Sequence, residues 1–437
     1  FLCKHKSVLG SSYTQKGRSG FRGKSSCLLH RKGEKQMQPL ELYIHIPFCV
    51  KKCAYCDFLS GPAGEKEKEE YVKMLVDEIR NCPDTVQNYR VISIFFGGGT
   101  PSLLTGEQIG RLMDTVREIF TLDEDAEITM EMNPGTVTEE KLRKYRQAGV
   151  NRLSIGLQSV NDEELRLLGR IHTYEEFREA YHLARANGFS NINVDLISAI
   201  PGQTVESWRR TLEQVMALSP EHISAYSLIL EEGTTFYKKY VEDEAKEGPK
   251  LPDEDAERQM YWDTETLMEK NGYHRYEISN YAKPGYECRH NIVYWTMDEY
   301  IGLGIGAASF FNGRRYSNTL DMKQYIRTME DVFDKRSADE IYQSQALDTI
   351  RHIDETVDVD TLMEEYVIFG LRMTRGISAA DFYDRFGHSL YDVYGDVIRS
   401  YVASGHMKDE KGMVFLTRKG IDVSNRILVD FLHDENK

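Results

Sequence analysis

The chain has 437 residues, of which 41% are hydrophobic and 29% are charged, and its formal net charge at pH 7 is −15. This length exceeds one ordinary domain and suits a large α/β domain with an extension. No run approaches the roughly 18 apolar residues of a membrane-spanning helix. An acidic chain repels a polyanion, so the composition argues against nucleic acid as a partner.

The first 36 residues are basic and Ser-rich, with nine Lys/Arg side chains and one acidic residue, Glu34. They lack the apolar core of a secretory signal. Two interpretations stay open: an organellar transit peptide, or translated leader sequence before a start at Met37. We favour the leader, because Lys32-Gly33-Glu34 can be encoded by a ribosome-binding sequence. Residues 1–36 are then a non-native or disordered basic leader.

Six apolar runs alternate with six helical patterns after residue 40. The runs have the continuous apolar character of strands buried on both faces. They are Leu42–Ile46, Val91–Phe96, Ala126–Met132, Arg152–Leu157, Ile192–Ile197 and Ile223–Leu228. The helical patterns are Lys66–Asn81, Thr105–Phe120, Glu139–Ala148, Asp162–Leu168, Tyr174–Asn187 and Val205–Leu218. Repeated βα units imply right-handed crossovers and a parallel sheet, and the pattern ends after residue 230. We therefore expect an α/β fold with a partial (β/α)6 TIM-like barrel over residues 37–285.

The rest of the chain predicts a second, mostly α unit. One helix is expected at Trp262–Asn271, and residues 286–363 are expected to connect the two units. Over residues 364–437 the predicted elements are helices at Tyr366–Met373, Ala379–Phe386 and Tyr394–Ala403, a β-hairpin at Met407–Leu416 and a last helix at Lys419–Asp430. This order predicts a winged-helix-like module. We expect it to be a structural cap rather than a DNA-binding unit, because the chain is acidic.

Three cysteines directly follow the first predicted strand. Cys49, Cys53 and Cys56 have the spacing C-x3-C-x2-C, which lets one loop offer three thiolates to an iron–sulfur cluster. Three ligands leave one iron open to a small bidentate ligand. Zinc is the alternative, but zinc usually takes four ligands, and the nearest other cysteine, Cys82, lies at a predicted helix end. The position also fits function, which gathers at the carboxyl ends of parallel strands.

With Tyr55 just before the last cysteine, this motif resembles the radical S-adenosylmethionine (SAM) superfamily. The resemblance implies a [4Fe–4S] cluster whose open iron is chelated by SAM and whose electron cleaves SAM to a 5′-deoxyadenosyl radical. Other unusual residues lie at the ends of successive predicted strands. By the same resemblance, the SAM pocket is lined by Tyr43, Gly98, Gly99, Thr100, Glu131, Gln158, Arg170 and Asp195.

The segments Tyr43–Cys49, Gly97–Ser102 and Leu153–Ser159 are similar to the oxygen-independent coproporphyrinogen III oxidase group. Its decarboxylases carry a further cysteine where this chain has Phe58. Together with the motif His290-Asn-Ile-Val-Tyr-Trp295, this departure resembles the HemW family of heme chaperones. That resemblance implies heme binding and delivery to hemoproteins such as respiratory oxidases. It also implies the bacterial cytoplasm, with transient contact to membrane proteins.

The motif offers candidate heme contacts. His290 has an imidazole that can ligate heme iron, and Tyr294 and Trp295 have flat rings that suit a porphyrin face. His45 and Cys288 are weaker candidates, and plain core packing of His290 is the alternative. Two other functions stay open: radical decarboxylation of coproporphyrinogen III to protoporphyrinogen IX, and an acidic redox scaffold that acts by contact alone. The sequence assigns no catalytic residue and no oligomeric state.

Overall fold

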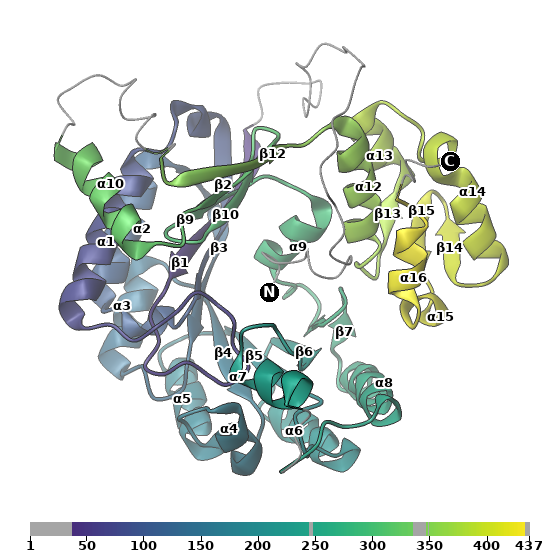
Figure 1. The fold of residues 1–437 in the computed structure, drawn as a ribbon, viewed down its shortest axis with the longest axis horizontal. Helices are drawn as coiled ribbons and strands as arrows, with labels where there is room; N and C mark the ends of the chain where they lie inside the picture. The colour runs from purple at the N-terminus through teal and green to yellow at the C-terminus, as the bar shows by residue number, and fades with distance from the viewer. Residues whose placement is uncertain (1–36, 244–247, 335–346, 348, 433–437) are drawn as a thin grey trace.

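The structure is a computed structural model that describes residues 37–243, 248–334, 347 and 349–432 (Figure 1). The segment predicted to be a leader, residues 1–36, lies outside them. The described residues form one twelve-stranded sheet with helices around it and, near the C-terminus, a helical unit with a three-stranded sheet. No helix in these ranges is long and apolar enough to cross a bilayer.

All six predicted strands are present and pair in parallel in sequence order. They are β1 (Gln38–Ile46), β2 (Tyr89–Gly98), β3 (Thr121–Met132), β4 (Arg152–Gln158), β5 (Asn191–Ser198) and β6 (His222–Ser227). The intervening helices are α1 (Glu65–Arg80), α2 (Gly106–Ile119), α3 (Glu139–Ala148), α4 (Asp162–Leu168), α5 (Tyr174–Ala186) and α6 (Val205–Ala217). Short helical turns lie at Asp84–Asn88 and Pro101–Leu103. The predicted α/β partial barrel is confirmed.

Strand β1 illustrates how the sequence builds this sheet. Leu40, Leu42, Ile44 and Ile46 alternate along it, are fully buried, and belong to the same apolar core as side chains of α1 and α2. Burial of each such side chain contributes about 1.5–3 kcal/mol. The residues between them, from Glu41 to His45, point to the other face because successive strand side chains alternate. That second face carries Tyr43, which was predicted to line the SAM pocket, together with Glu41 and His45.

The sheet continues on both sides of the six strands. β9 (Tyr300–Leu303) pairs in parallel with β1. β10 (Ala308–Phe311), β11 (Arg314–Asn318) and β12 (Arg351–Thr356) follow it in antiparallel order, while β8 (Asn280–Ala282) and β7 (His274–Arg275) extend the edge at β6. In the glycine-rich run, Gly302 is required: a Cβ there would lie 2.2 Å from the Ala308 carbonyl oxygen. The segment predicted to connect two units therefore supplies strands to the sheet.

The helices between β6 and the C-terminal unit include α7 (Thr235–Tyr237) with a π-helical turn (Lys238–Glu242), α8 (Glu254–Lys270), α9 (Arg289–Thr296) and α10 (Met322–Asp334). They pack at different places: α8 on α6, α10 on α1, and α9 on β2 and the first helix of that unit. Helix α8 begins eight residues before the predicted start, because the Asp253 side chain accepts a hydrogen bond from the Ala256 N–H and caps it there. In Figure 1, α9 lies between the barrel and the C-terminal unit.

The C-terminal unit has the predicted mostly helical composition and a three-stranded sheet. Its elements are α12 (Val359–Gly370), β13 (Ile377–Ser378), α13 (Ala379–Phe386), α14 (Leu390–Ala403), β14 (Met407–Glu410), β15 (Met413–Leu416), α15 (Arg418–Ile421) and α16 (Ser424–Val429). The strand order β13-β15-β14 joins the hairpin to the strand before α13, as in a winged helix. The last predicted helix is divided into α15 and α16.

Candidate functional site

The loop after β1 that carries the three cysteines is fixed at its base and along its length. The Cys49 N–H donates to the Gly61 carbonyl at 2.9 Å, and the Gly61 N–H donates to the Pro47 carbonyl at 3.0 Å. Farther along, the Ala54 N–H donates to the Leu168 carbonyl at the end of α4, at 3.0 Å. The cysteines are partly exposed and form no disulfide. The loop is therefore held in place by backbone contacts that leave the sulfur atoms free.

A chain of side-chain contacts joins two of these cysteines across the sheet. The Thr100 hydroxyl lies 3.5 Å from the Cys49 sulfur and accepts a hydrogen bond from Asn133 Nδ2 at 2.7 Å. Asn133 Oδ1 in turn accepts from Arg170 Nη2 at 2.5 Å, and Arg170 Nη1 lies 3.8 Å from the Cys53 sulfur. Thr100 and Arg170 were predicted at this site, whereas Asn133 was not. Its only signal was an amide at the end of a strand.

The Cys56 sulfur lies in surroundings that favour the protonated thiol while no cation is bound. Burial and, to a smaller extent, charge on Cys53 and Cys49 raise the pKa of Cys56 to about 11. A bound iron–sulfur cluster reverses this preference, because a metal stabilises thiolates. No three Cys, His, Asp or Glu side chains among the described residues converge as the ligands of one metal ion. A cubane needs no such convergence, since each thiolate binds a different iron.

The glycine loop after β2 packs against the start of the cysteine loop. The Gly99 N–H donates to the Ile46 carbonyl at 2.9 Å, and a Cβ on Gly99 would lie 2.6 Å from the Phe48 carbonyl oxygen. Gly98 has φ +107°, and a Cβ there would lie 2.4 Å from the His45 ring. Both positions therefore require glycine, which brings the backbone of this loop beside the cluster motif.

Two carboxyl groups follow at the ends of the next strands. Glu131 Oε2 accepts a hydrogen bond from the Gly98 N–H at 3.1 Å. Burial and, second, the nearby Asp195 charge raise the pKa of Glu131 to about 7. Asp195 accepts from Asn193 Nδ2 at 2.8 Å and from the Ser154 hydroxyl at 3.1 Å, and burial raises its pKa as well. Such a pair can accept hydrogen bonds from sugar hydroxyls or an amino group.

The remaining predicted SAM residues lie on the same face. Gln158 ends β4 with φ +73°, and its buried Oε1 has no hydrogen-bond partner among the described residues. Tyr43 donates through its hydroxyl to His45 Nδ1 at 3.1 Å, and His45 Nε2 donates to the Leu59 carbonyl at 2.9 Å. Burial lowers the pKa of His45 to about 4, so its ring is neutral. His45 thus links β1 to the cysteine loop, and Gln158 Oε1 is a buried acceptor without a partner among the described residues.

His290, the predicted heme ligand, lies inside the barrel on α9. Its Nδ1 is 2.9 Å from Glu41 Oε2 and 3.0 Å from the Ser93 hydroxyl, and its Nε2 is 3.2 Å from the Tyr294 hydroxyl. The ring stacks on Phe95 with centroids 4.9 Å apart. Burial lowers the pKa of His290 to about 3 and raises the pKa of Glu41, so burial favours the neutral form of both groups. Ligation of iron by Nε2 requires the Tyr294 hydroxyl to move away.

The other residues of this motif face different surroundings. Trp295 is buried in a small apolar cluster with Tyr276, Cys288 and Met373, at the side of the C-terminal unit. Cys288 donates through its thiol to a Glu127 carboxyl oxygen at 3.4 Å, and burial raises its pKa. The motif therefore joins the barrel interior to the second unit. The heme-ligand assignment stays a prediction.

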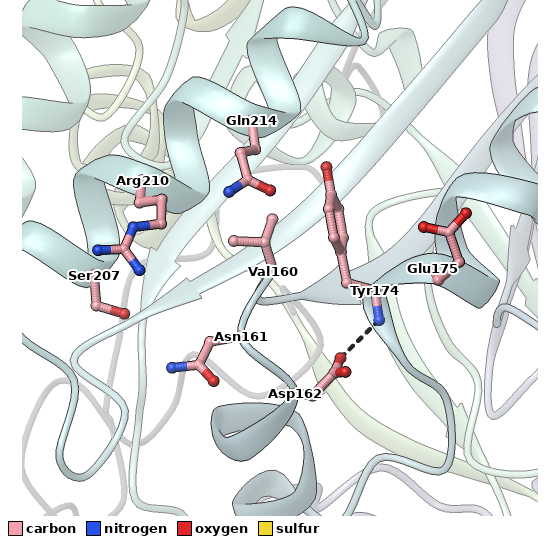
Figure 2. A pocket seen from close by; sticks show the side chains of 8 residues that line it. All are labelled: Val160, Asn161, Asp162, Tyr174, Glu175, Ser207, Arg210 and Gln214. Atoms are coloured by element: carbon pink, nitrogen blue, oxygen red, sulfur yellow. Dashed lines mark hydrogen bonds between the residues drawn. The ribbon is translucent and has the colours of Figure 1, made fainter.

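A cavity of about 420 Å³ lies outside this site, next to α4, α5 and α6 (Figure 2). It is lined by polar side chains of mixed charge, among them Asp162, Glu175 and Arg210. The Tyr174 N–H donates to Asp162 Oδ1 at 2.8 Å in its wall. None of the predicted cluster, SAM or heme residues lines it.

A parallel partial barrel with three free cysteines after its first strand defines a radical SAM protein. In agreement, the Radical SAM superfamily profile matches residues 43–215, and the HemN C-terminal domain profile matches residues 357–423. The heme chaperone HemW of Bacillus subtilis (strain 168) is 34% identical over 392 residues, which cover 89% of this chain and 98% of that relative. The heme chaperone HemW of Escherichia coli (strain K12) is 42% identical over 308 residues, covering 68% of this chain and 79% of that one.

A solved structure, that of coproporphyrinogen III oxidase (HemN) from Escherichia coli, a radical SAM enzyme, matches this chain with a TM-score of 0.74. The match has 25% sequence identity and covers 90% of each chain. The chain belongs to the HemW family of radical SAM proteins. The predicted resemblance to the coproporphyrinogen III oxidase group and to HemW is confirmed.

Proposed function

We propose that this chain is a heme chaperone, which binds heme and delivers it to hemoproteins while it carries a [4Fe–4S] cluster and SAM. The observation that supports this most is Phe58. It stands two residues after Cys56, where decarboxylases of the related group carry a further cysteine. A phenyl ring has no thiol and no polar atom, so this position supplies apolar surface instead of chemistry. The side chain is 40% exposed, which leaves that surface open to a ligand.

Cys49, Cys53 and Cys56 would hold three irons of the cluster, because they are free and share one anchored loop. SAM would lie over the glycine loop at Gly98 and Gly99. Its polar groups would meet the rest of the predicted set: Tyr43, Thr100, Glu131, Gln158, Arg170 and Asp195. The partnerless Gln158 oxygen and the two carboxyl groups suit a ligand with amino and hydroxyl donors. When bound, a cluster with SAM supplies one-electron reductive chemistry.

For heme, the candidate contacts are His290, Tyr294 and Trp295. His290 is neutral, which suits a metal ligand, and its Nε2 has a single hydroxyl as partner. Since the side chain is buried, heme can reach it only if the groups of α9 around it, such as the Tyr294 hydroxyl, move. The recipients would be hemoproteins such as respiratory oxidases, reached from the bacterial cytoplasm through transient contact with membrane proteins.

A second candidate function is decarboxylation of coproporphyrinogen III. The likeness to coproporphyrinogen III oxidase over 90% of the chain favours it, since the fold is shared along almost its whole length. One paired experiment separates the two. The reduced, cluster-loaded protein is incubated anaerobically with SAM and coproporphyrinogen III, and a parallel sample is titrated with heme. The chaperone proposal expects stable heme binding and no protoporphyrinogen, whereas several turnovers without heme binding would reject it.

A further inference from the structure

Exposed large apolar side chains gather around the cysteine loop. Of the six most exposed ones in the described ranges, Val50 at 58% lies on this loop, and three border it: Leu320 at 69%, Ile171 at 57% and Ile229 at 50%. Phe58, at 40%, lies on the loop itself. We call these five side chains the mouth rim. Apolar side chains exposed singly are common on proteins, but a group at one site marks a place where a ligand or partner binds.

Ile171, Ile229 and Leu320 of the mouth rim belong to three chain segments that contact the cysteine loop. Ile171 follows Arg170, whose guanidinium is 3.8 Å from the Cys53 sulfur. Ile229 lies between Leu228 and Leu230, which belong to the same apolar cluster as Ala54 and Tyr55 of the loop.

On the other side, the Leu320 side chain flanks Gly306 together with Leu59. A Cβ on that glycine would lie 3.1 Å from Leu320 and 2.9 Å from Leu59. The rim thus follows the chain segments that pack on the cysteine loop after β4, β6 and β11.

Two lysines lie at the tip of the loop, while Asp57 and Asp321 adjoin the rim residues Phe58 and Leu320 in the sequence. Lys51 and Lys52 are exposed at the tip of the loop, and Lys52 Nζ donates to the Phe58 carbonyl at 3.0 Å. Heme combines a flat apolar macrocycle with two carboxylate side chains. An apolar rim next to two ammonium groups matches both features.

We infer that heme binds on the mouth rim, with its apolar edge against Phe58, Ile171 and Ile229 and its propionates toward Lys51 and Lys52. This inference rests on the proposed heme-chaperone function and adds the place where heme first binds. Heme bound there would cover the cluster loop and would lie outside the barrel, separate from the buried His290. The rim would then be the binding site of the carried heme, and His290 a group that heme reaches only after the groups of α9 around it move.

The test uses the full chain loaded with cluster and SAM, and measures the heme that it retains as pyridine hemochromogen across a heme titration. Ile171→Glu, Ile229→Glu and the pair Lys51→Glu/Lys52→Glu alter the rim. The matched controls, Ile353→Glu and Tyr383→Glu, change side chains that are each 59% exposed and lie outside the rim. We expect the Kd for heme to rise about tenfold or more in each rim variant, a difference of about 1.4 kcal/mol, and to change less than about twofold in the controls.

Iron content and circular dichroism confirm that each variant is folded and loaded. Heme Kd values equal to wild type in the rim variants would overturn the inference while leaving the proposed function intact. Rim variants that bind heme normally but fail to transfer it or to self-associate would also overturn the inference. Such a result would mean that the rim contacts a protein and not heme. If the wild-type chain retains no heme, the proposed function fails together with the inference.

Discussion

Asn133 is the central link between Cys49 and Cys53, and its replacement by alanine tests whether this link supports the cluster. The variant loses one hydrogen bond from the charged Arg170, worth about 1.5–3 kcal/mol, and one neutral hydrogen bond to Thr100, worth about 0.5–1.5 kcal/mol. We expect the free energy of unfolding to fall by about 2–4 kcal/mol. Since Arg170 then keeps only the Gly156 carbonyl and the Cys53 sulfur, the cluster should be lost to a chelator about tenfold faster.

Asn151→Ala is the matched control at the opposite end of the sheet. Its side chain also makes two hydrogen bonds, donating to the Ala126 carbonyl at 2.7 Å and accepting from the Ile128 N–H at 2.8 Å. Its loss should cost about 1–3 kcal/mol of stability without faster loss of iron. Iron and sulfide are measured over time after anaerobic reconstitution. Equal rates of cluster loss in Asn133→Ala and Asn151→Ala would refute a specific role for Asn133.

Further predictions concern the carboxyl pair, the cysteines and the heme motif. Burial raises the pKa of Glu131 from 4.5 to about 7, so the folded state retains a proton that the unfolded state releases. Glu131 should thus lower the free energy of unfolding progressively as pH rises from about 4.5 to about 7. In Glu131→Gln, thermal unfolding measured across this pH range should no longer show that decrease. The same pH dependence in the variant and the wild type would contradict the raised pKa. Cys49→Ser should lose the cluster and Cys82→Ser, which changes a buried thiol, should keep it, as iron per chain will show. Tyr294→Phe frees His290 Nε2, so heme that moves from the mouth rim into the barrel should bind His290 at least as tightly, and His290→Ala should alter the spectrum of that heme without releasing heme from the rim; an unaltered spectrum would remove His290 as a ligand.

The barrel could be predicted because its signals are local. A strand buried on both faces is continuously apolar, and helices α3 (Glu139–Ala148) and α4 (Asp162–Leu168) begin and end at the predicted residues. Strand β9 (Tyr300–Leu303) escaped prediction, because it is four residues long and its partner β1 is distant in sequence. Its glycine-rich continuation looks like a loop until the packing of Gly302 against Ala308 is known.

The part of the site that could be predicted is the part where residue type and sequence spacing both indicate metal binding. Three cysteines within eight residues indicate a metal loop without any structure. Asn133 did not stand out, because an amide before a proline is equally typical of a turn, and its role depends on Arg170 from another segment. His290 could be selected from its motif, but its burial could not. Its partners Glu41 and Ser93 come from two strands far away in the sequence.

If the chain carries heme to other proteins, the rate at which bound heme leaves it should depend on the protein that receives the heme. The heme-loaded protein with cluster and SAM is mixed either with a recipient hemoprotein lacking its heme or with apomyoglobin, which captures heme that dissociates spontaneously. We expect heme to reach the recipient faster than it reaches apomyoglobin, because transfer takes place through contact. Equal rates would mean passive release, and would contradict a chaperone function.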